Sequence, residues 1–312
     1  MEGESIRNMS RILTDNAGLS IADAIEGIST PVIKINGNVD LSVATSSANG
    51  LMSYTDKAML DSAPFGILCF PSTMSNVAAY HNSVFRGKNL GTSVTQVQLN
   101  AISDGTFEDL FLGDYWVISS VTYRIVAFDY YWRCGDTELN KHHIVIMPDA
   151  SMMSSVWNEK VNDAHTTAGC YIGSKIRENI KAENGPQDKI IAAFGDEHVL
   201  SYRQLYPTSQ NSSGSATGWA WIDARVELPN EVQIYGCMAW TDNGKGNGYE
   251  VGIDKWQLPL FTIMPSMANI RAYWWLRSVG SGTSACNVNN DGYASYNGAG
   301  DSYGVRPLSL IG

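Results

Sequence analysis

The sequence predicts an α+β fold, with β-rich segments before and after a helical stretch. Three observations predict it. Runs of β-branched and aromatic residues occur between 107 and 149, and apolar residues at helical spacing follow between 174 and 194. Strand and loop patterns then return from 219 to the end of the chain. With 312 residues, 44% of them hydrophobic, the chain can bury a sizeable core.

We expect three parts along the chain: an N-terminal region over 1–62, a connecting β/helix region over 63–106, and the main domain over 107–312. In the first part, apolar residues 31–35 precede the turn signal Asn36-Gly37, which predicts a small hairpin or a linking strand. A short amphipathic helix is expected within 44–65.

The middle of the chain alternates between the two kinds of element. A helix is predicted over 95–102 with Ser93 or Thr95 as its cap, and another over 174–181. A further helix begins near 188. Strands are predicted over 66–70, 115–118, 122–129, 143–148, 219–228 and 232–235.

Loops and two final strands complete the pattern. A flexible Ser/Gly-rich loop is expected over 208–218 and a glycine-rich turn over 243–248. The stretches 273–277 and 304–310 are expected to be core strands that bracket a segment almost free of bulky aliphatic residues. That segment, 278–303, is therefore expected to be a presented surface.

Charge and composition exclude several classes of protein. The net charge of −10, without a cluster of Lys and Arg, argues against nucleic acid or an anionic membrane as a partner. The N-terminus has no apolar signal region, and no run of about 18 apolar residues occurs, so neither secretion nor membrane insertion is expected. Five dispersed cysteines without a CxxC motif are expected to be reduced and mostly buried.

The stretch ATSSANGLMSYTDKAMLDSAPF, over 44–65, resembles an element of bacteriophage tail-fibre proteins that reads ANGLMS, then DK, then LD. The matching positions are 48–53, 56–57 and 60–61. The resemblance implies that residues 1–62 serve attachment to other virion proteins and trimerisation, which makes the chain a homotrimer. An ordinary surface helix is the alternative.

The C-terminal residues Trp274-Trp275-Leu276-Arg277 and Gly304-Val305-Arg306-Pro307 bracket the presented segment. They resemble C-type-lectin-fold domains, including the variable proteins of diversity-generating retroelements and the related formylglycine-generating enzymes. The resemblance covers about 107–312 and implies a C-type-lectin-like ligand-binding domain. Cys286 is the only cysteine in the C-terminal stretch from 273 to the end, where the formylglycine-generating enzymes depend on a cysteine pair, so that activity is not expected.

Retroelement mutagenesis rewrites adenines, so an Asn codon cannot become Lys, Glu, Gln, Met or Trp. None of these five types occurs in 278–303, although they make up about one residue in six of the chain. A Gly/Ser/Asn-rich loop is biased against them in any case, so an invariant polar loop remains the alternative.

In a diversified segment, scaffold residues should alternate with variable ones, because successive side chains on a strand point to opposite faces. Ala285, Val288, Gly292 and Gly304 are the expected scaffold. Tyrosines would act as aromatic anchors and Asn and Ser as adaptable hydrogen-bonding groups. The expected outward-facing ligand-binding residues are Ser281, Thr283, Asn287, Asn289, Asn290, Tyr293, Tyr296, Asn297 and Asp301.

No catalytic residue, metal site or cofactor is predicted. His142 and His143 are adjacent and should point to opposite faces, and 287–292 lacks the acidic ligands of a calcium loop. Arg277 and Arg306 are expected to be buried structural groups paired with a carboxylate or carbonyls.

The sequence thus predicts a phage virion protein, not an enzyme, that contacts a bacterial cell-surface ligand, either protein or glycan, through 278–303. The alternative is a structural virion protein, a fibre shaft or capsid decoration, whose lectin-like domain serves assembly only. A glycan hydrolase ranks third, and it would need two carboxylates in a cleft.

Overall fold

The computed structural model describes residues 32–35, 39–42, 77–161, 164–241 and 252–312. The chain divides into two compact units, residues 1–70 and 71–312. The described residues mix helices with a larger share of strands, which confirms the α+β prediction. The predicted helix within 44–65, the strand at 66–70 and the turn at 243–248 lie outside the described residues.

In the first unit, β1 (Val32–Ile35) pairs antiparallel with β2 (Val39–Ser42), with Ile35 opposite Val39. This confirms the strand expected before Asn36-Gly37.

The first sheet of the second unit has five antiparallel strands in the order β11-β16-β5-β4-β3. All residues of β5 are buried, since the sheet carries side chains of the core on both faces. The strands are β3 (Tyr115–Ile118), β4 (Val121–Phe128), β5 (Ile144–Pro148), β11 (Val226–Glu227) and β16 (Leu308–Ile311).

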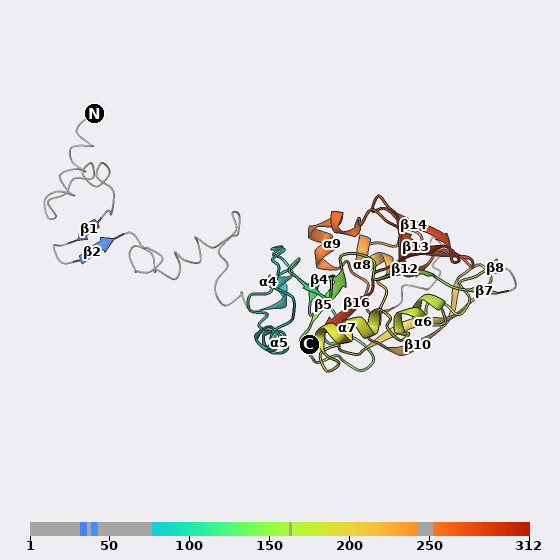
Figure 1. Ribbon diagram of the computed structural model, residues 1–312, viewed down its shortest axis with the longest axis horizontal. Coiled ribbons are helices and arrows are strands. Elements are labelled where there is room, and N and C mark those ends of the chain that lie inside the picture. The colour runs from blue at the N-terminus through green and yellow to red at the C-terminus, as the bar shows by residue number, and fades with distance from the viewer. Residues whose placement is uncertain (1–31, 36–38, 43–76, 162–163, 242–251) are drawn as a thin grey trace, which may run out of the picture. The chain divides into compact units, whose positions relative to one another are not determined.

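The second sheet also has five strands, in the order β14-β13-β12-β15-β6, and β12 and β15 run parallel to each other. Figure 1 shows β12, β13 and β14 side by side in the brown and red part of the ribbon. The strands are β6 (Met153–Val156), β12 (Trp274–Val279), β13 (Ser284–Val288), β14 (Ala294–Gly298) and β15 (Ser302–Val305).

The predicted strand over 304–310 is two strands in different sheets. β15 ends at Val305 in the second sheet, and β16 begins at Leu308 in the first. Pro307 has no N–H for a sheet hydrogen bond and restricts the residue before it, so the chain leaves one sheet here. The C-terminal stretch therefore joins the two sheets.

The helices begin where side chains or proline satisfy the first turn. Thr95 and Gln98 form a reciprocal capping box, which confirms the helix predicted over 95–102, and Ser174 caps the helix predicted over 174–181. Pro186 opens the third helix, close to the predicted start near 188. The helices of this unit are α4 (Ala78–His81), α5 (Gln96–Ser103), α6 (Lys175–Lys181), α7 (Pro186–Phe194), α8 (Glu231–Tyr235), α9 (Pro259–Ile263) and the 3₁₀ helix η2 (Pro265–Ala268).

The predicted strand over 232–235 is wrong, because this segment is helix α8. Asn230 accepts a hydrogen bond from the backbone of Gln233, whose side chain accepts one from the backbone of Asn230, and Gly236 ends the helix at φ 76°. These local caps outweigh the β-branched character of the segment.

The predicted loop over 208–218 is also largely wrong. β9 (Tyr202–Gln210) pairs with β10 (Ala216–Ala224), so only a short turn separates two long strands. A second small hairpin joins β7 (Lys160–Val161) to β8 (Ala164–His165).

One hydrophobic core runs through the second unit and includes the fully buried indoles of Trp116, Trp157, Trp274 and Trp275. Leu99 and Ile102 of α5 belong to this core, so part of the expected connecting region packs with the domain that follows it. No helix in the described ranges has the length and apolar character of a membrane span.

Candidate functional site

The predicted binding residues lie on the β13–β14 hairpin and on the turns that flank it. Five are exposed: Thr283, Asn290, Tyr293, Tyr296 and Asp301. Ser281, Asn289 and Asn297 are partly exposed. The expected scaffold residues Ala285, Val288 and Gly304 are buried, whereas Gly292 is partly exposed in a turn.

Asn287 corrects the prediction, because its side chain is fully buried. It lies opposite Trp275 on one side and Ser295 on the other, and its Nδ2 donates to Oδ1 of Asn297 at 2.9 Å. The four residues 285–288 of β13 are all buried, so both faces of this strand are covered and neither faces solvent.

The predicted residues do not share one face. Tyr296 and Asn297 are adjacent on β14, so their side chains point to opposite sides of the sheet. The turn with Ser281 and Thr283 lies at one end of β13, and the turn with Tyr293 lies at the other. Five residues of β13 separate these ends by about 13 Å.

Two of the predicted residues form the turns themselves. Oδ1 of Asn289 accepts hydrogen bonds from the backbone N–H groups of Asp291 and Tyr293, and Oγ of Ser281 accepts one from Thr283. These side chains hold the loop shape, as Asx and ST turns do. They are therefore less available to a ligand than their exposure indicates.

An aromatic pair stands on the opposite side of β14 from Asn297. The rings of Tyr296 and Trp240 lie 4.7 Å apart, and both side chains are exposed, at 44% and 36%. The indole Nε1 of Trp240 donates to the carbonyl of Ala294 at 3.1 Å. A Cβ at Gly280 would lie 3.3 Å from Cβ of Tyr296, so this glycine makes room for the tyrosine.

A buried carboxylate holds Trp240 in place. Glu231 of α8 is fully buried and accepts hydrogen bonds from the backbone N–H groups of Trp240 and Thr241 and from the hydroxyl of Thr241. Hydrogen bonds to a charged acceptor are among the stronger ones in proteins. Glu231 therefore fixes the backbone of Trp240, and the aromatic pair is preorganised beside β14.

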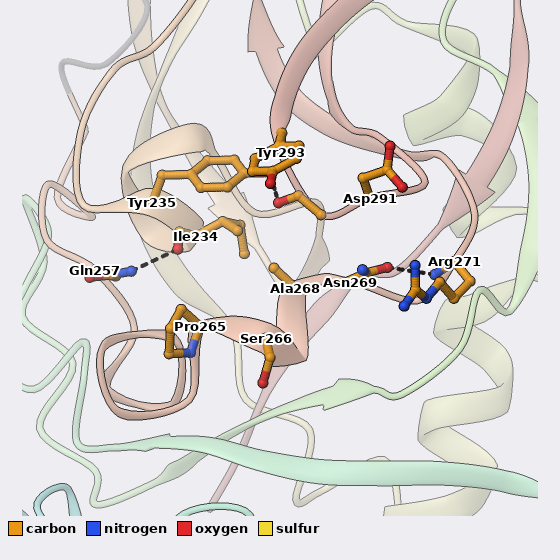
Figure 2. A pocket seen from close by; sticks show the side chains of 11 residues that line it. Ile234, Tyr235, Gln257, Pro265, Ser266, Ala268, Asn269, Arg271, Asp291 and Tyr293 are labelled. Atoms are coloured by element: carbon orange, nitrogen blue, oxygen red, sulfur yellow. Dashed lines mark hydrogen bonds between the residues drawn. The ribbon is translucent and has the colours of Figure 1, made fainter.

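A pocket of about 610 Å³ lies at the other end of the hairpin, between α8, η2 and the turn that links β13 to β14. Figure 2 shows Tyr235 extending toward Tyr293, with Arg271 and Asp291 on the far side. The hydroxyl of Tyr235 donates to the carbonyl of Gly292 at 3.1 Å, and burial raises the pKa of this phenol, so it stays protonated. Gly292 has φ 89°, and a Cβ there would lie 2.8 Å from Cβ of Asn269.

The two arginines of the C-terminal bracket are structural, as predicted. Nη2 of Arg277 donates to the buried carboxylate of Asp254 at 2.5 Å. Nε of Arg306 donates to the carbonyl of Pro148 at 3.0 Å, and its guanidinium lies over the ring of Trp274. Burial lowers the pKa of Arg306 to about 10, so it still carries its charge at neutral pH.

The adjacent histidines are engaged separately. His142 stacks on Trp132 with the ring centroids 4.2 Å apart, and its Nδ1 lies 2.7 Å from Asp129. His143 is buried, and its Nε2 accepts the backbone N–H of Tyr131. Within the part of the chain that the structure describes, no three His, Cys, Asp or Glu side chains are grouped to hold a metal ion.

The cysteine prediction is only partly correct. Of the four cysteines in the described residues, none of which forms a disulfide, Cys170 and Cys286 are buried, Cys134 is partly buried and Cys237 is exposed. Cys69 lies outside the described residues.

Sequence reasoning missed Trp240, Tyr235, Asn269 and Arg271, which all lie outside 278–303. Trp240 gave a signal that could have been used, since it directly precedes a polar, glycine-rich stretch that offers no core strand for a tryptophan. The others come to the surface through the packing of α8 and η2 on the hairpin, which no local pattern indicates.

Residues 239–311 match a protein family described as a domain of unknown function, DUF6273. The match covers β12 to β16 and includes Trp240, Arg271 and the hairpin. No curated protein and no solved structure matches the chain.

Proposed function

We propose that this protein is a phage virion protein that binds a bacterial surface ligand through the β13–β14 hairpin and the residues packed on it. The observation that carries the proposal is the exposed pair of Tyr296, on β14, and Trp240, which lies beside it. Glu231 fixes the backbone of Trp240, and Gly280 makes room for Tyr296. Exposed aromatic side chains on a fixed scaffold supply contact area at low entropic cost, which is typical of binding surfaces.

The C-type-lectin-like fold is part of the same proposal. The first strands of the domain and its last strand pair in one sheet, β5 with β16, while the other sheet presents the hairpin. Trp274, Trp275 and Arg277 are buried on β12, which belongs to the same sheet as the presented hairpin. Substitutions on β14 would then leave the core unchanged.

The resemblance of 44–65 to tail fibres supports attachment of residues 1–62 to other virion proteins, and a homotrimer. Three copies of a weak site raise the apparent affinity, because the second and third contacts form at high effective concentration. No catalytic step is part of the proposal.

Binding to cells tests the function directly. The labelled full-length protein is incubated with a panel of bacterial strains, and the fraction bound is measured alongside protection from phage infection by excess protein. Saturable binding to infected strains, with protection, is the expected result. A protein that assembles into virions but binds no strain would instead be a structural component of the virion.

Sequencing tests the diversification. The codons for 278–303 are compared across a population that carries the gene, and neighbouring DNA is searched for a near-copy repeat and a reverse transcriptase. We expect adenine-confined substitutions at exposed positions such as Tyr296 and Asn290, and none at Asn287. An invariant segment without a repeat would remove the retroelement part of the proposal and leave the binding part standing.

A further inference from the structure

The pocket between α8, η2 and the β13–β14 turn combines aromatic and polar groups in one concave site. Its volume of about 610 Å³ lies within the range of about 300–1,000 Å³ common for small-ligand sites. Tyr293 is 71% exposed at its edge, and Tyr235 lines it from α8. Asn269, Arg271 and Asp291 line it as well.

Several polar groups of this pocket have no partner in the protein. Among the described residues, the Arg271 guanidinium and the Asp291 carboxylate form no ion pair and no side-chain hydrogen bond. Asn269 uses its Oδ1 to accept the backbone N–H of Arg271 at 2.8 Å, which leaves its Nδ2 free to donate. The pocket therefore offers donors and an acceptor to a ligand without breaking an internal contact.

The backbone at this site is fixed. Arg271 has φ 59°, a left-handed conformation that is costly for a residue with a side chain, and Gly292 has φ 89°. Each is held by a hydrogen bond: the N–H of Arg271 bonds Asn269, and the carbonyl of Gly292 bonds Tyr235. Strain of this kind persists where the surrounding structure fixes it and is frequent at ligand sites.

The charges of the lining indicate what kind of ligand fits. Arg271 and Asp291 carry opposite charges, so the pocket selects neither an anion nor a cation. A guanidinium donates hydrogen bonds and a carboxylate accepts them, and hydroxyl groups can satisfy both at once. The negative face of a tyrosine ring attracts the weakly positive C–H groups on the flat side of a sugar ring.

We propose that this pocket is a subsite for an uncharged saccharide unit, stacked on Tyr293 and held through its hydroxyls by Arg271 and Asp291. The inference rests on the proposed function and names the ligand class of one end of the binding surface. An extended peptide fits less well, because it would need a groove with repeated apolar positions and not one pocket with two opposite charges.

Sugar binding by the full-length protein is the test. Saturation-transfer NMR is recorded with neutral probes, glucose, galactose, mannose and N-acetylglucosamine, and with glucuronic acid as the acidic comparator. We expect at least one neutral sugar to bind, and Arg271→Ala and Asp291→Ala each to weaken it at least tenfold. Tyr293→Ala should abolish the signal. Val97→Ala, at a side chain of α5 that is 78% exposed and does not line the pocket, should leave it unchanged.

The proposal is overturned if no neutral sugar binds, if glucuronic acid binds better, or if the pocket variants bind as well as the parent protein. Circular dichroism of each variant shows whether it is folded, and the Val97→Ala protein gives the reference. Asp291→Asn keeps the size of the side chain while it removes the charge and replaces one acceptor oxygen by an NH₂ donor, so it separates a lost hydrogen-bond acceptor from a lost fold.

Cell binding separates failure of this inference from failure of the proposed function. If periodate treatment of the bacteria abolishes binding and protease treatment does not, the ligand is a glycan, as expected. If binding is protease-sensitive and survives Arg271→Ala with Tyr293→Ala, the saccharide subsite is wrong while receptor binding stands. If the parent protein binds no cells, the proposed function itself fails, whatever the NMR result.

Discussion

β12 and β14 lie two strands apart in the same sheet and differ completely in their exposure. Every residue of β12 is buried, four of the five residues of β13 are buried, and none of the residues of β14 is. The indoles of Trp274 and Trp275 on β12 donate to the carbonyls of Ala268 and Ser155. Within one sheet, stability is therefore concentrated at one strand and surface chemistry at another.

This difference in exposure explains how the presented segment can tolerate sequence substitutions. Side chains on β14 contact few buried neighbours, so substitutions there alter the surface at little cost in folding free energy. β13 lies between β12 and β14 and has only buried or partly buried residues, so it separates the core strand from the surface strand. Substitutions on the buried strand β12 and on the exposed strand β14 test this difference.

The largest expected effect comes from Trp274→Ala. Removing a fully buried indole leaves a cavity, and the change should lower the free energy of unfolding by about 3–5 kcal/mol. Arg306 also loses the ring beneath its guanidinium. Urea denaturation monitored by circular dichroism measures the loss. A decrease below about 1 kcal/mol would mean that β12 is not the stabilising strand.

Tyr296→Ala makes a comparable deletion of an aromatic ring at the exposed end of the sheet. We expect the free energy of unfolding to fall by less than about 1 kcal/mol, because Tyr296 is 44% exposed. Binding to cells should weaken by about 2 kcal/mol, about thirtyfold, as for an interface hot spot. Unchanged binding would remove the aromatic pair from the binding surface.

Glu231→Gln tests the group that holds Trp240. One oxygen becomes an NH₂ that cannot accept a hydrogen bond, so we expect a loss of about 1–3 kcal/mol in the free energy of unfolding. Glu197→Gln, at a side chain that is 75% exposed, is the matched control. Equal melting temperatures for the two variants would show that the buried carboxylate does not stabilise the 240–241 segment.

The smallest effect is expected for Thr283→Ala. Its backbone carbonyl accepts the N–H of Ala299, while its side chain is exposed and takes no part in that bond. Both the free energy of unfolding and cell binding should stay within about 0.5 kcal/mol of the parent protein. A marked loss of binding would extend the binding surface to this end of the hairpin.

Sequence reasoning succeeded where a short-range signal decided the structure. The cap at Thr95 was one of the two expected from residue types, the helix beginning at Ser174 was expected from its spacing, and the strands of the first sheet were expected from their composition. It failed at α8, where the caps at Asn230 and Gly236 were present but a β-branched pair was given more weight. It also failed at 208–218, where Ser209 pairs with Gly218 and Gln210 with Ala216, so that only residues 211–215 form a turn.

For the binding surface, the sequence correctly gave Ala285 and Val288 as buried and Tyr296 as exposed. It misplaced Asn287, because both faces of β13 are buried, and whether a second face is covered depends on tertiary packing and not on the alternation along the strand.

Propensity, capping and periodicity act over a few neighbouring residues, so the sequence alone predicted the α+β class, most strands, the cap at Thr95 and the aromatic residues of the presented segment. Tertiary packing places Tyr296 against Trp240 and lets Glu231 bind the backbone of Trp240. It also brings Tyr235, Arg271 and Asp291 into one pocket. These contacts join residues up to about sixty positions apart, and they exist only once α8 and η2 have packed on the hairpin.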